Sequence, residues 1–538
     1  MNACRAAAPQ VEANRVFEIT LTSEKTYADP FNDLELAAVF DAPGGKTLRV
    51  PAFWAGGQTW KVRYSSPAIG THSYKTECSD AANAKLHGVN GQVEVIAYTG
   101  DNPLYKHGAI RVAAGHRHFE HTDGTPFFWL GDTWWMGLCN RLHWPEDFQT
   151  LTADRKQKGF NVVQIVAGLY PDMPAFDERG ANEAGFPWEK DYSRIRPEYY
   201  EQADRRIDYL VSQGIVPCIV GAWGYHLPWI GTEKMTKHWQ YLVARYGALP
   251  VVWCAAGETA MPYYLAKDKK KDAQLQKEEW TSVCRHIRKV DAFSRPLTLH
   301  PSCGVPTRSN VTDPSVADFE LLQTGHGSHE VIAPTIRQIR AARNAQPPVP
   351  VINGEPAYEN LLNKIPADVC RALFWVCMLN GAAGHTYGAN GIWQVNRTEQ
   401  PYGNSPGGNN WGTLPWPDAM KLPGSAQLAL GKKLLTQFEW SRFEPQPNCV
   451  QWDDPATKDA ALCASGLAGK VLIVYVPKPQ AIAVKELGAE KDYDAALFDP
   501  ISGERKPLGK VRTAADGTWR SPKPDGDHDW VLLLEAAR

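Results

Sequence analysis

Near its start the chain alternates apolar and polar side chains, which is the pattern of strands with one buried face. Turn residues separate the alternating runs, as at Pro43–Gly45 and Gly56–Gly57. The runs are Val16–Thr22, Leu36–Phe40 and Trp60–Tyr64. Short strands with turns at this spacing predict an antiparallel β-sandwich over residues 15–102. Similar short runs return late in the chain and predict a second β-sandwich over residues 443–538.

The middle of the chain follows a different pattern, in which short apolar runs alternate with longer helix-like segments. Asp123-Gly124, a tight-turn signal within a predicted hairpin, precedes the first run. The runs predicted to be strands are Phe127–Gly131, Asn161–Val166, Val216–Ala222, Pro250–Ala255, Leu297–His300, Phe319–Gln323, Val349–Asn353 and Gly384–Tyr387. The predicted helices are Trp144–Lys158, Pro197–Ser212, Lys237–Tyr246, Lys277–Val290, Thr335–Arg343, Pro366–Asn380 and Gln427–Phe438. No helix is evident between the fifth and sixth strands.

Strands that alternate with helices in this way predict a (β/α)8 barrel, which we place at residues 103–442. A doubly wound sheet is the competing topology, but it normally carries a glycine-rich phosphate loop after its first strand. Here the first strand runs into Gly131-Asp132-Thr133-Trp134-Trp135, which cannot cradle a phosphate in that way. The predicted fold class is therefore a central (β/α)8 TIM barrel flanked by N-terminal and C-terminal antiparallel β-sandwich domains.

Two glutamates follow predicted strands on opposite sides of such a barrel, whose active site lies at the carboxyl ends of its strands. Glu258 follows the fourth strand and Glu355 the seventh. Glycosidic cleavage needs two carboxyls, one to protonate the leaving oxygen and one to attack the anomeric carbon or activate water. Gly257 and Gly354 precede the glutamates and are expected to allow an unusual backbone conformation there. A surface or ion-pairing role is the alternative for either glutamate alone.

Other strand ends carry aromatic and polar side chains that suit a sugar, because rings stack on its apolar faces and polar groups bind its hydroxyls. The candidate substrate-binding residues are Asp132, Trp134, Trp135, Trp223, His226, His300, His326, Tyr358, His385, Tyr387 and Trp393. Metal binding is the alternative for His300, His326 and His385, but they lack a ligand spacing. We therefore predict neither a metal site nor a cofactor. Internal packing remains the alternative for each candidate.

Three other segments carry expectations of their own. The loop Trp393–Trp416, rich in Asn and Gly, is expected to shape the pocket. His116, His118 and His121 lie on the predicted hairpin and are expected to be exposed. The charged run Lys267–Asp272 predicts a solvated loop or the start of a helix.

Composition limits the binding partners and the cellular location that the protein is expected to have. The 538 residues carry a formal net charge of −2, which gives no electrostatic reason to bind nucleic acid or an anionic membrane. No run is long and apolar enough to span a membrane. The eleven cysteines form no zinc pattern, and Cys449 and Cys463 are one candidate disulfide pair. We expect a secreted or periplasmic protein whose signal peptide is absent from this sequence, with the cytoplasm as the alternative. The oligomeric state stays open.

Three motifs resemble the apiosidase-like glycoside hydrolases. They are Asp123-Gly-Thr-Pro-Phe-Phe-Trp-Leu-Gly-Asp-Thr-Trp-Trp, Val351-Ile-Asn-Gly-Glu-Pro-Ala-Tyr-Glu and Gly384-His-Thr-Tyr-Gly-Ala-Asn-Gly-Ile-Trp. The flanking β regions are similar to the domains that often precede and follow these barrels. The resemblance implies an exo-acting enzyme on polysaccharide side chains, such as those ending in the furanosides apiose or arabinofuranose, with Glu355 as nucleophile. Ala256-Gly257-Glu258 departs from the family's common Gly-Gly-Asp, so the sugar stays open.

The resulting hypothesis is a retaining glycoside hydrolase of oligo- or polysaccharides, with Glu258 as general acid/base and Glu355 as nucleophile. Burial and the charge of Glu355 should raise the pKa of Glu258, and the two carboxyls should lie about 5–5.5 Å apart. A polysaccharide lyase acting on a uronate is one alternative, although the strand ends offer almost no Arg or Lys to bind the uronate carboxylate. A non-catalytic glycan- or matrix-binding protein is the other.

Overall fold

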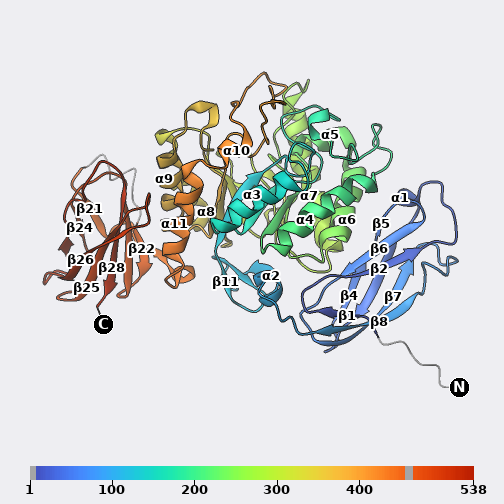
Figure 1. Cartoon of the computed structure of the whole chain (residues 1–538), viewed down its shortest axis with the longest axis horizontal. Helices are drawn as coiled ribbons and strands as arrows, with labels where there is room; N and C mark the ends of the chain where they lie inside the picture. The colour runs from blue at the N-terminus through green and yellow to red at the C-terminus, as the bar shows by residue number, and fades with distance from the viewer. Residues whose placement is uncertain (1–7, 455–463, 538) are drawn as a thin grey trace.

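The computed structural model describes residues 8–454 and 464–537. An N-terminal and a C-terminal β domain lie on opposite sides of a central parallel barrel (Figure 1), which confirms the predicted fold class. Among the described residues, none of the helices combines the length and the apolar character that a membrane span requires.

The N-terminal domain contains a five-stranded sheet, ordered β1-β8-β7-β3-β4, and a three-stranded sheet, β2-β6-β5. The elements are β1 (Gln10–Glu12), β2 (Phe17–Thr22), α1 (Pro30–Asp33), β3 (Leu36–Asp41), β4 (Thr47–Pro51), β5 (Phe53–Trp54), β6 (Thr59–Tyr64), β7 (Gly70–Cys78), β8 (Asn90–Ile96) and α2 (Pro103–Lys106). The two sheets meet where Phe40 stacks on Tyr64, with ring centroids 3.9 Å apart. One pairing departs from the antiparallel prediction, because β1 runs parallel to β8.

Eight parallel strands form the barrel, in the order β16-β15-β14-β13-β12-β19-β18-β17. They are β12 (Trp129–Trp134), β13 (Val162–Val166), β14 (Val216–Val220), β15 (Val252–Cys254), β16 (Leu297–Thr298), β17 (Glu320–Gln323), β18 (Val351–Glu355) and β19 (Gly384–Tyr387). Every residue of these strands is buried, which is why the sequence shows continuous apolar runs rather than alternation.

The seam between β16 and β17 closes the barrel without a regular strand ladder. Asp318 donates its backbone N–H to Leu297 O at 2.8 Å, and Thr298 Oγ1 donates to Phe319 O at 2.8 Å. The connection that spans this seam holds only the short 3₁₀ turns Thr307–Asn310 and Pro314–Val316, in agreement with the absence of a predicted helix there.

Helices surround the barrel near their predicted positions. They are α3 (Glu146–Gln157), α4 (Pro197–Ser212), α5 (Leu227–Ile230), α6 (Thr232–Tyr246), α7 (Lys269–Val290), α8 (Ile332–Asn344), α9 (Ala367–Leu379), α10 (Trp416–Ala419) and α11 (Pro423–Leu435). Helix α7 begins earlier than predicted because the Asp268 side chain caps it, accepting a hydrogen bond from Lys271 N at 3.0 Å. The charged run is therefore a helix start.

A small sheet lies at the edge of the barrel opposite α10 (Figure 1). It contains β9 (Ile110–Val112), β10 (Phe119–His121) and β11 (Pro126–Phe127), and Phe119 packs against Trp129 and Phe319. The predicted hairpin is present, but the prediction that its histidines are exposed is wrong for His121. That ring is buried because it fills the space under the sheet, where its Nδ1 lies 2.6 Å from Gly108 O.

The C-terminal domain also contains two sheets, ordered β20-β22-β23-β28-β25-β26 and β21-β24-β27. Its strands are β20 (Glu444–Pro445), β21 (Val450–Trp452), β22 (Ala464–Leu467), β23 (Val471–Val476), β24 (Ile482–Val484), β25 (Asp492–Phe498), β26 (Arg505–Arg512), β27 (Trp519–Arg520) and β28 (Trp530–Ala536). Cys449 is buried in this domain, and Cys463 lies outside the described residues, so their pairing stays a prediction.

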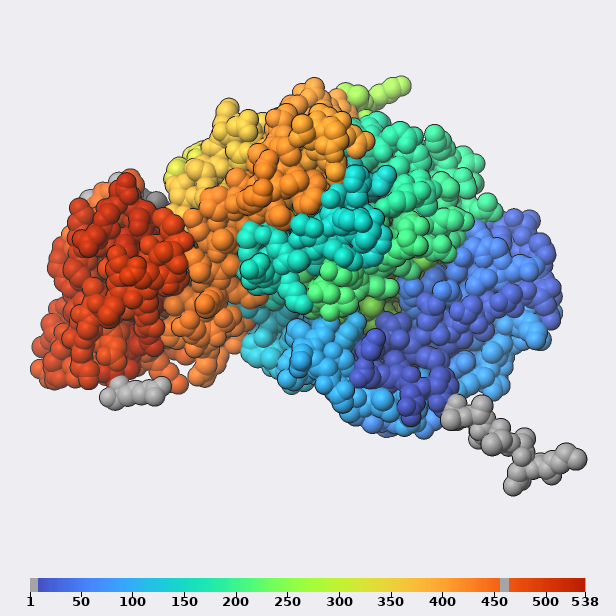
Figure 2. All heavy atoms as spheres, viewed as in Figure 1, coloured from blue at the N-terminus to red at the C-terminus, as the bar shows by residue number. Residues whose placement is uncertain are grey.

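Buried arginines attach both β domains to the barrel. Arg63 of β6 and Arg245 of α6 share Asp204 of α4, with N···O distances of 2.7 Å each. On the other side, Arg371 of α9 donates through Nε to Asp529 Oδ2 at 2.9 Å. Figure 2 shows the red C-terminal domain packed against the orange segment that carries α11, and the blue N-terminal domain packed against the green part of the barrel.

Inside the barrel, Asp132 of β12 pairs with Arg155 of α3. Arg155 Nε lies 2.5 Å from Asp132 Oδ2, and neither side chain has exposed surface. Trp134 Nε1 also donates to Asp132 Oδ2, at 2.8 Å. The carboxylate of Asp132 therefore joins the first strand to its helix.

Replacing Asp132 by alanine should lower the free energy of unfolding by about 3–5 kcal/mol, because the buried Arg155 guanidinium loses its only fully buried carboxylate partner among the described residues and keeps only the partly exposed Asp154. Urea unfolding followed by circular dichroism measures this change. Asp418→Ala removes an exposed carboxylate and should alter stability by less than about 0.5 kcal/mol. An Asp132→Ala protein as stable as the Asp418→Ala control would contradict the structural role.

Candidate active site

A cavity of about 180 Å³ lies at the carboxyl ends of the barrel strands. Predicted site residues from six different strand ends line it: Trp135, Trp223, Glu258, His326, Glu355, Tyr358 and Trp393. The structure thus brings the two glutamates to one enclosed space with four aromatic rings from strand ends. Trp393 and Trp411 of the loop expected to shape the pocket are both in its wall.

The glycines before the glutamates serve close packing rather than an unusual backbone of their own. A Cβ on Gly257 would lie 2.1 Å from the Trp223 ring, and one on Gly354 would lie 2.3 Å from Leu321 Cδ2. The left-handed residue is Glu258 itself, with φ of 39°. This corrects the expectation of unusual glycine backbones and shows that strain falls on the carboxyl-bearing residue.

Glu258 is held as an acid. Trp223 Nε1 donates to Glu258 Oε2 at 3.2 Å, and no cation contacts the carboxyl in the described part of the chain. Burial, with the added repulsion from Glu355, raises the pKa of Glu258 to about 7. At neutral pH a large fraction of Glu258 therefore carries the proton that a general acid needs.

Glu355 is held as an anion by three neighbours. His326 Nε2 lies 2.7 Å from Glu355 Oε1, Gln323 Nε2 donates to the same oxygen at 3.0 Å, and His300 Nε2 lies 2.8 Å from Oε2. Burial alone would raise the pKa of Glu355, but His300 and His326 outweigh it and hold that pKa well below its usual range. In turn Glu355 raises the pKa of His326 against the opposing effect of burial.

His300 lies between a backbone carbonyl and the Glu355 carboxyl. Its Nδ1 lies 2.9 Å from Pro301 O, which can only accept, so Nδ1 is a donor. Its Nε2 faces Glu355 Oε2 at 2.8 Å, in a contact that is not aligned as a hydrogen bond. A fully buried imidazole thus lies directly beside Glu355.

Several polar atoms around the cavity have no hydrogen-bond partner among the described residues. They include Trp393 Nε1, His326 Nδ1 and Gln323 Oε1, all buried. Leaving such groups unpaired costs free energy, and a ligand with hydroxyl groups would satisfy them. No three described His, Cys, Asp or Glu side chains are arranged to hold a metal ion.

The structure places the remaining candidates in the interior, away from the cavity. Asp132 and Trp134 bind each other and Arg155, and Tyr387 donates its hydroxyl to Glu359. His226 Nε2 lies 3.0 Å from Tyr170 O, and burial lowers the pKa of His226 to about 4. Burial likewise lowers the pKa of His385 to about 3. His385 packs its ring against Phe374. None of these five side chains lines the cavity, so their contact with a substrate stays a prediction that the geometry does not favour.

Sequence reasoning missed Asp172, Tyr264 and Gln323, which also line the cavity, and covered Trp411 only as part of the loop Trp393–Trp416. Gln323 ends the sixth strand, so the strand-end rule could have found it. Asp172 follows the second strand, and the strand-end rule gave no candidate residue after that strand. Tyr264 lies in a loop without any periodic pattern, and no sequence signal marks it.

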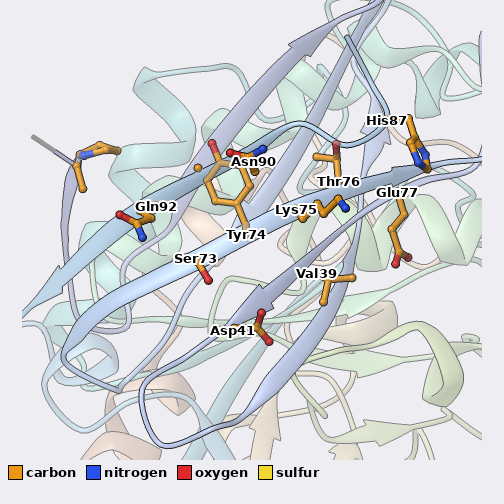
Figure 3. A pocket seen from close by; sticks show the side chains of 13 residues that line it. Val39, Asp41, Ser73, Tyr74, Lys75, Thr76, Glu77, His87, Asn90 and Gln92 are labelled. Atoms are coloured by element: carbon orange, nitrogen blue, oxygen red, sulfur yellow. The ribbon is translucent and has the colours of Figure 1, made fainter. Parts of the chain in front are cut away.

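A larger hollow, of about 1080 Å³, lies on the N-terminal domain (Figure 3). Asp41, Lys75 and Glu77 on β3 and β7 are among its side chains. Its carboxylates already have surface partners, because Thr47 Oγ1 donates to Asp41 at 2.7 Å and Arg49 Nε donates to Glu77 at 3.1 Å. It is remote from the strand ends of the barrel, and we do not assign the chemistry to it.

Comparison with known structures shows the same architecture elsewhere. A structure described as "Glycoside hydrolase" has a TM-score of 0.65 at 22% identity and covers 82% of this chain and 99% of its own. A glycoside hydrolase family 5 structure from Bacteroides vulgatus ATCC 8482 gives 0.65 at 22% identity, covering 81% and 95%. A "putative glycoside hydrolase" from the same organism gives 0.71 at 18% identity, covering 98% and 100%. No curated protein matches the chain.

Three family models match the chain, one in each of the N-terminal, central and C-terminal parts. A domain of unknown function (DUF5060) matches residues 10–79, and "Putative collagen-binding domain of a collagenase" matches residues 448–535. The model described as "Apiosidase-like, catalytic domain" matches residues 113–442 and so contains the barrel with Glu258 and Glu355. Since this match spans more than half of the sequence, the chain belongs to the apiosidase-like family and is a glycoside hydrolase.

Proposed function

We propose that this enzyme releases a terminal neutral sugar from an oligo- or polysaccharide with retention of configuration, using Glu258 as general acid/base and Glu355 as nucleophile. One observation carries the proposal: two carboxyls in one cavity have pKa values shifted in opposite directions, with Glu258 raised and Glu355 lowered. Such a divided pair supplies a proton donor and an anion at the same pH.

The mechanism follows from these two protonation states. Glu355 attacks the anomeric carbon while Glu258 protonates the leaving oxygen, which gives a glycosyl-enzyme. Glu258, now ionised, removes a proton from water as the water attacks the same carbon, and Glu355 is released. His300 and His326 keep Glu355 ionised before the first step.

Exo action on a furanoside such as apiose or arabinofuranose is part of the proposal. The cavity, at about 180 Å³, is smaller than the roughly 300–1,000 Å³ of common ligand pockets, which favours one sugar residue. A lyase is disfavoured because no Lys or Arg is among the residues that line the cavity, so a uronate carboxylate would have no guanidinium or ammonium partner.

Glu258→Gln and Glu355→Gln should both abolish most activity on aryl glycosides, tested as apiosides, arabinofuranosides, galactofuranosides and pyranosides. A strongly acidic phenol needs little protonation as it leaves. Glu258→Gln should therefore keep much of its rate of glycosyl-enzyme formation on aryl glycosides with such a leaving group. Glu355→Gln should lose this rate on good and poor leaving groups alike. On a poor leaving group, Glu258→Gln should lose about 10²–10⁴-fold in kcat/KM. Glu330→Gln changes an exposed carboxyl of a neighbouring loop and should match the parent. If Glu258→Gln and Glu355→Gln hydrolysed these substrates at the parental rate, both catalytic assignments would be wrong.

Retention of configuration follows from the double displacement. Proton NMR in the first minutes of hydrolysis should show the product anomer with the configuration of the substrate. Retention requires carboxyls about 5–5.5 Å apart, whereas inversion needs about 6.5–9.5 Å. An inverted first product would therefore contradict Glu355 as nucleophile and would indicate that it acts as a base that activates water.

The pH profile of kcat/KM should fall on the alkaline side. Because the pKa of Glu258 is raised to about 7 and its protonated form is the active one, activity should drop about tenfold per pH unit above that value. Glu355 has a lowered pKa and stays ionised on the acid side, so activity should change little down to about pH 5. Rates that rise between pH 7 and 9 would contradict the assignment of Glu258.

A further inference from the structure

A third carboxyl, that of Asp172, lies in the wall of the same cavity. It belongs to the loop after β13, and only 6% of the residue is exposed. Trp411 Nε1 donates to Asp172 Oδ2 at 2.9 Å, and the Tyr264 hydroxyl donates to Oδ1. Within residues 8–454 and 464–537 it forms no ion pair, and burial raises the pKa of Asp172 above its ordinary value.

Four loops hold Asp172 in place. Its φ is 56°, a left-handed conformation that is uncommon for residues other than glycine, although Asp adopts it more readily than most. The Tyr225 hydroxyl from the loop after β14 bonds to Tyr170 O and Met173 O on either side, at 3.0 Å each. Tyr264 comes from the loop after β15 and Trp411 from the loop after β19. Burying a carboxylate without an ion-pair partner costs free energy, and its position in the cavity wall indicates a ligand.

We propose that Asp172 is a specificity-determining residue, which accepts hydrogen bonds from adjacent hydroxyl groups of a neutral sugar and excludes uronates. The inference rests on the proposed function of this cavity. Each carboxylate oxygen has one protein donor and keeps lone pairs free, so the pair matches the two donors of a vicinal diol. An acidic sugar would instead place its carboxylate near Asp172 and ionised Glu355 in a cavity that no Lys or Arg lines. Arg179 acts on Asp172 from outside the cavity wall, where its Nη2 donates to Asp172 O at 3.4 Å.

Binding of free monosaccharides tests this without any need for hydrolysis. D-Apiose, L-arabinose, D-galactose and D-galacturonate would be titrated into the full-length protein and followed by NMR. At least one neutral sugar should bind, and galacturonate should bind about tenfold or more weakly than galactose. Asp172→Asn should weaken the neutral sugar about tenfold or more, since it removes hydrogen bonds to a charged group. Asp172→Asn should also reduce or reverse the preference for galactose over galacturonate. A purely structural role of Asp172 would not change that preference.

Two control variants keep the test decisive. Glu178→Gln removes an exposed carboxylate from the same loop and should leave binding unchanged. Trp411→Phe removes one donor to Asp172 but keeps the carboxylate, so the preference for neutral sugars should persist even if Asp172→Asn fails to fold. The proposal is overturned if the parent binds no neutral sugar, binds galacturonate as tightly as galactose, or binds equally well as Asp172→Asn. It is also overturned if Trp411→Phe loses the preference for neutral sugars.

The outcomes also separate this proposal from the proposed function. Sugar binding that depends on Asp172, in a protein that hydrolyses no glycoside, would contradict only the catalytic roles of Glu258 and Glu355. Hydrolysis that proceeds with unchanged KM and substrate preference in Asp172→Asn would contradict only the recognition role.

Discussion

Two carboxyl groups that share a small cavity and are both buried cannot both ionise cheaply, and the site depends on how that conflict is resolved. Here the charge is assigned to Glu355, because His300 and His326 contact its two oxygens. Among the described residues, Glu258 has only a neutral indole donor, so burial and the neighbouring anion leave it with the proton. The different protonation of the two glutamates is thus set by the histidines that contact one of them.

The barrel makes this arrangement possible by bringing residues distant in sequence to one end of a closed sheet. His300, His326 and Glu355 follow or end β16, β17 and β18, so their spacing is set by the strand order. Around Glu258 the packing is tighter, because Gly257 lets the Trp223 ring lie directly over the backbone. That ring supplies the only hydrogen bond to the Glu258 carboxyl among the described residues.

The success of the strand-end rule depended on where each residue lies relative to the end of its strand. Candidates beyond the last strand residue, such as Trp135, Tyr358 and Trp393, line the cavity, whereas Asp132, Trp134, His385 and Tyr387 lie within β12 and β19 and face internal partners. For β12 the predicted strand ended at Gly131 instead of Trp134, and that error exchanged wall for core. Strand β19 has its predicted bounds, and His385 and Tyr387 were candidates although they lie within it. His226 lies past its strand, yet a 3₁₀ turn directs it to Tyr170.

Hydrophobic periodicity could not predict which loop residues line the cavity. The roles of Asp172 and Tyr264 depend on contacts between loops far apart in sequence, and no local pattern encodes those contacts. The domain order, by contrast, followed from hydrophobic spacing, because buried parallel strands and half-buried antiparallel strands leave different periods in the sequence. The left-handed backbone of Glu258 was also unforeseen, because no local sequence pattern marks it.

The seam between β16 and β17 has a consequence for heat inactivation. His300 and His326 follow the two strands that flank it, and only a few hydrogen bonds, such as that from Asp318 N to Leu297 O, join those strands. A slight widening there on warming would draw the two imidazoles apart while the rest of the barrel stayed intact. Glu355 would then lose part of its counter-charge, so loss of activity would precede melting of the fold.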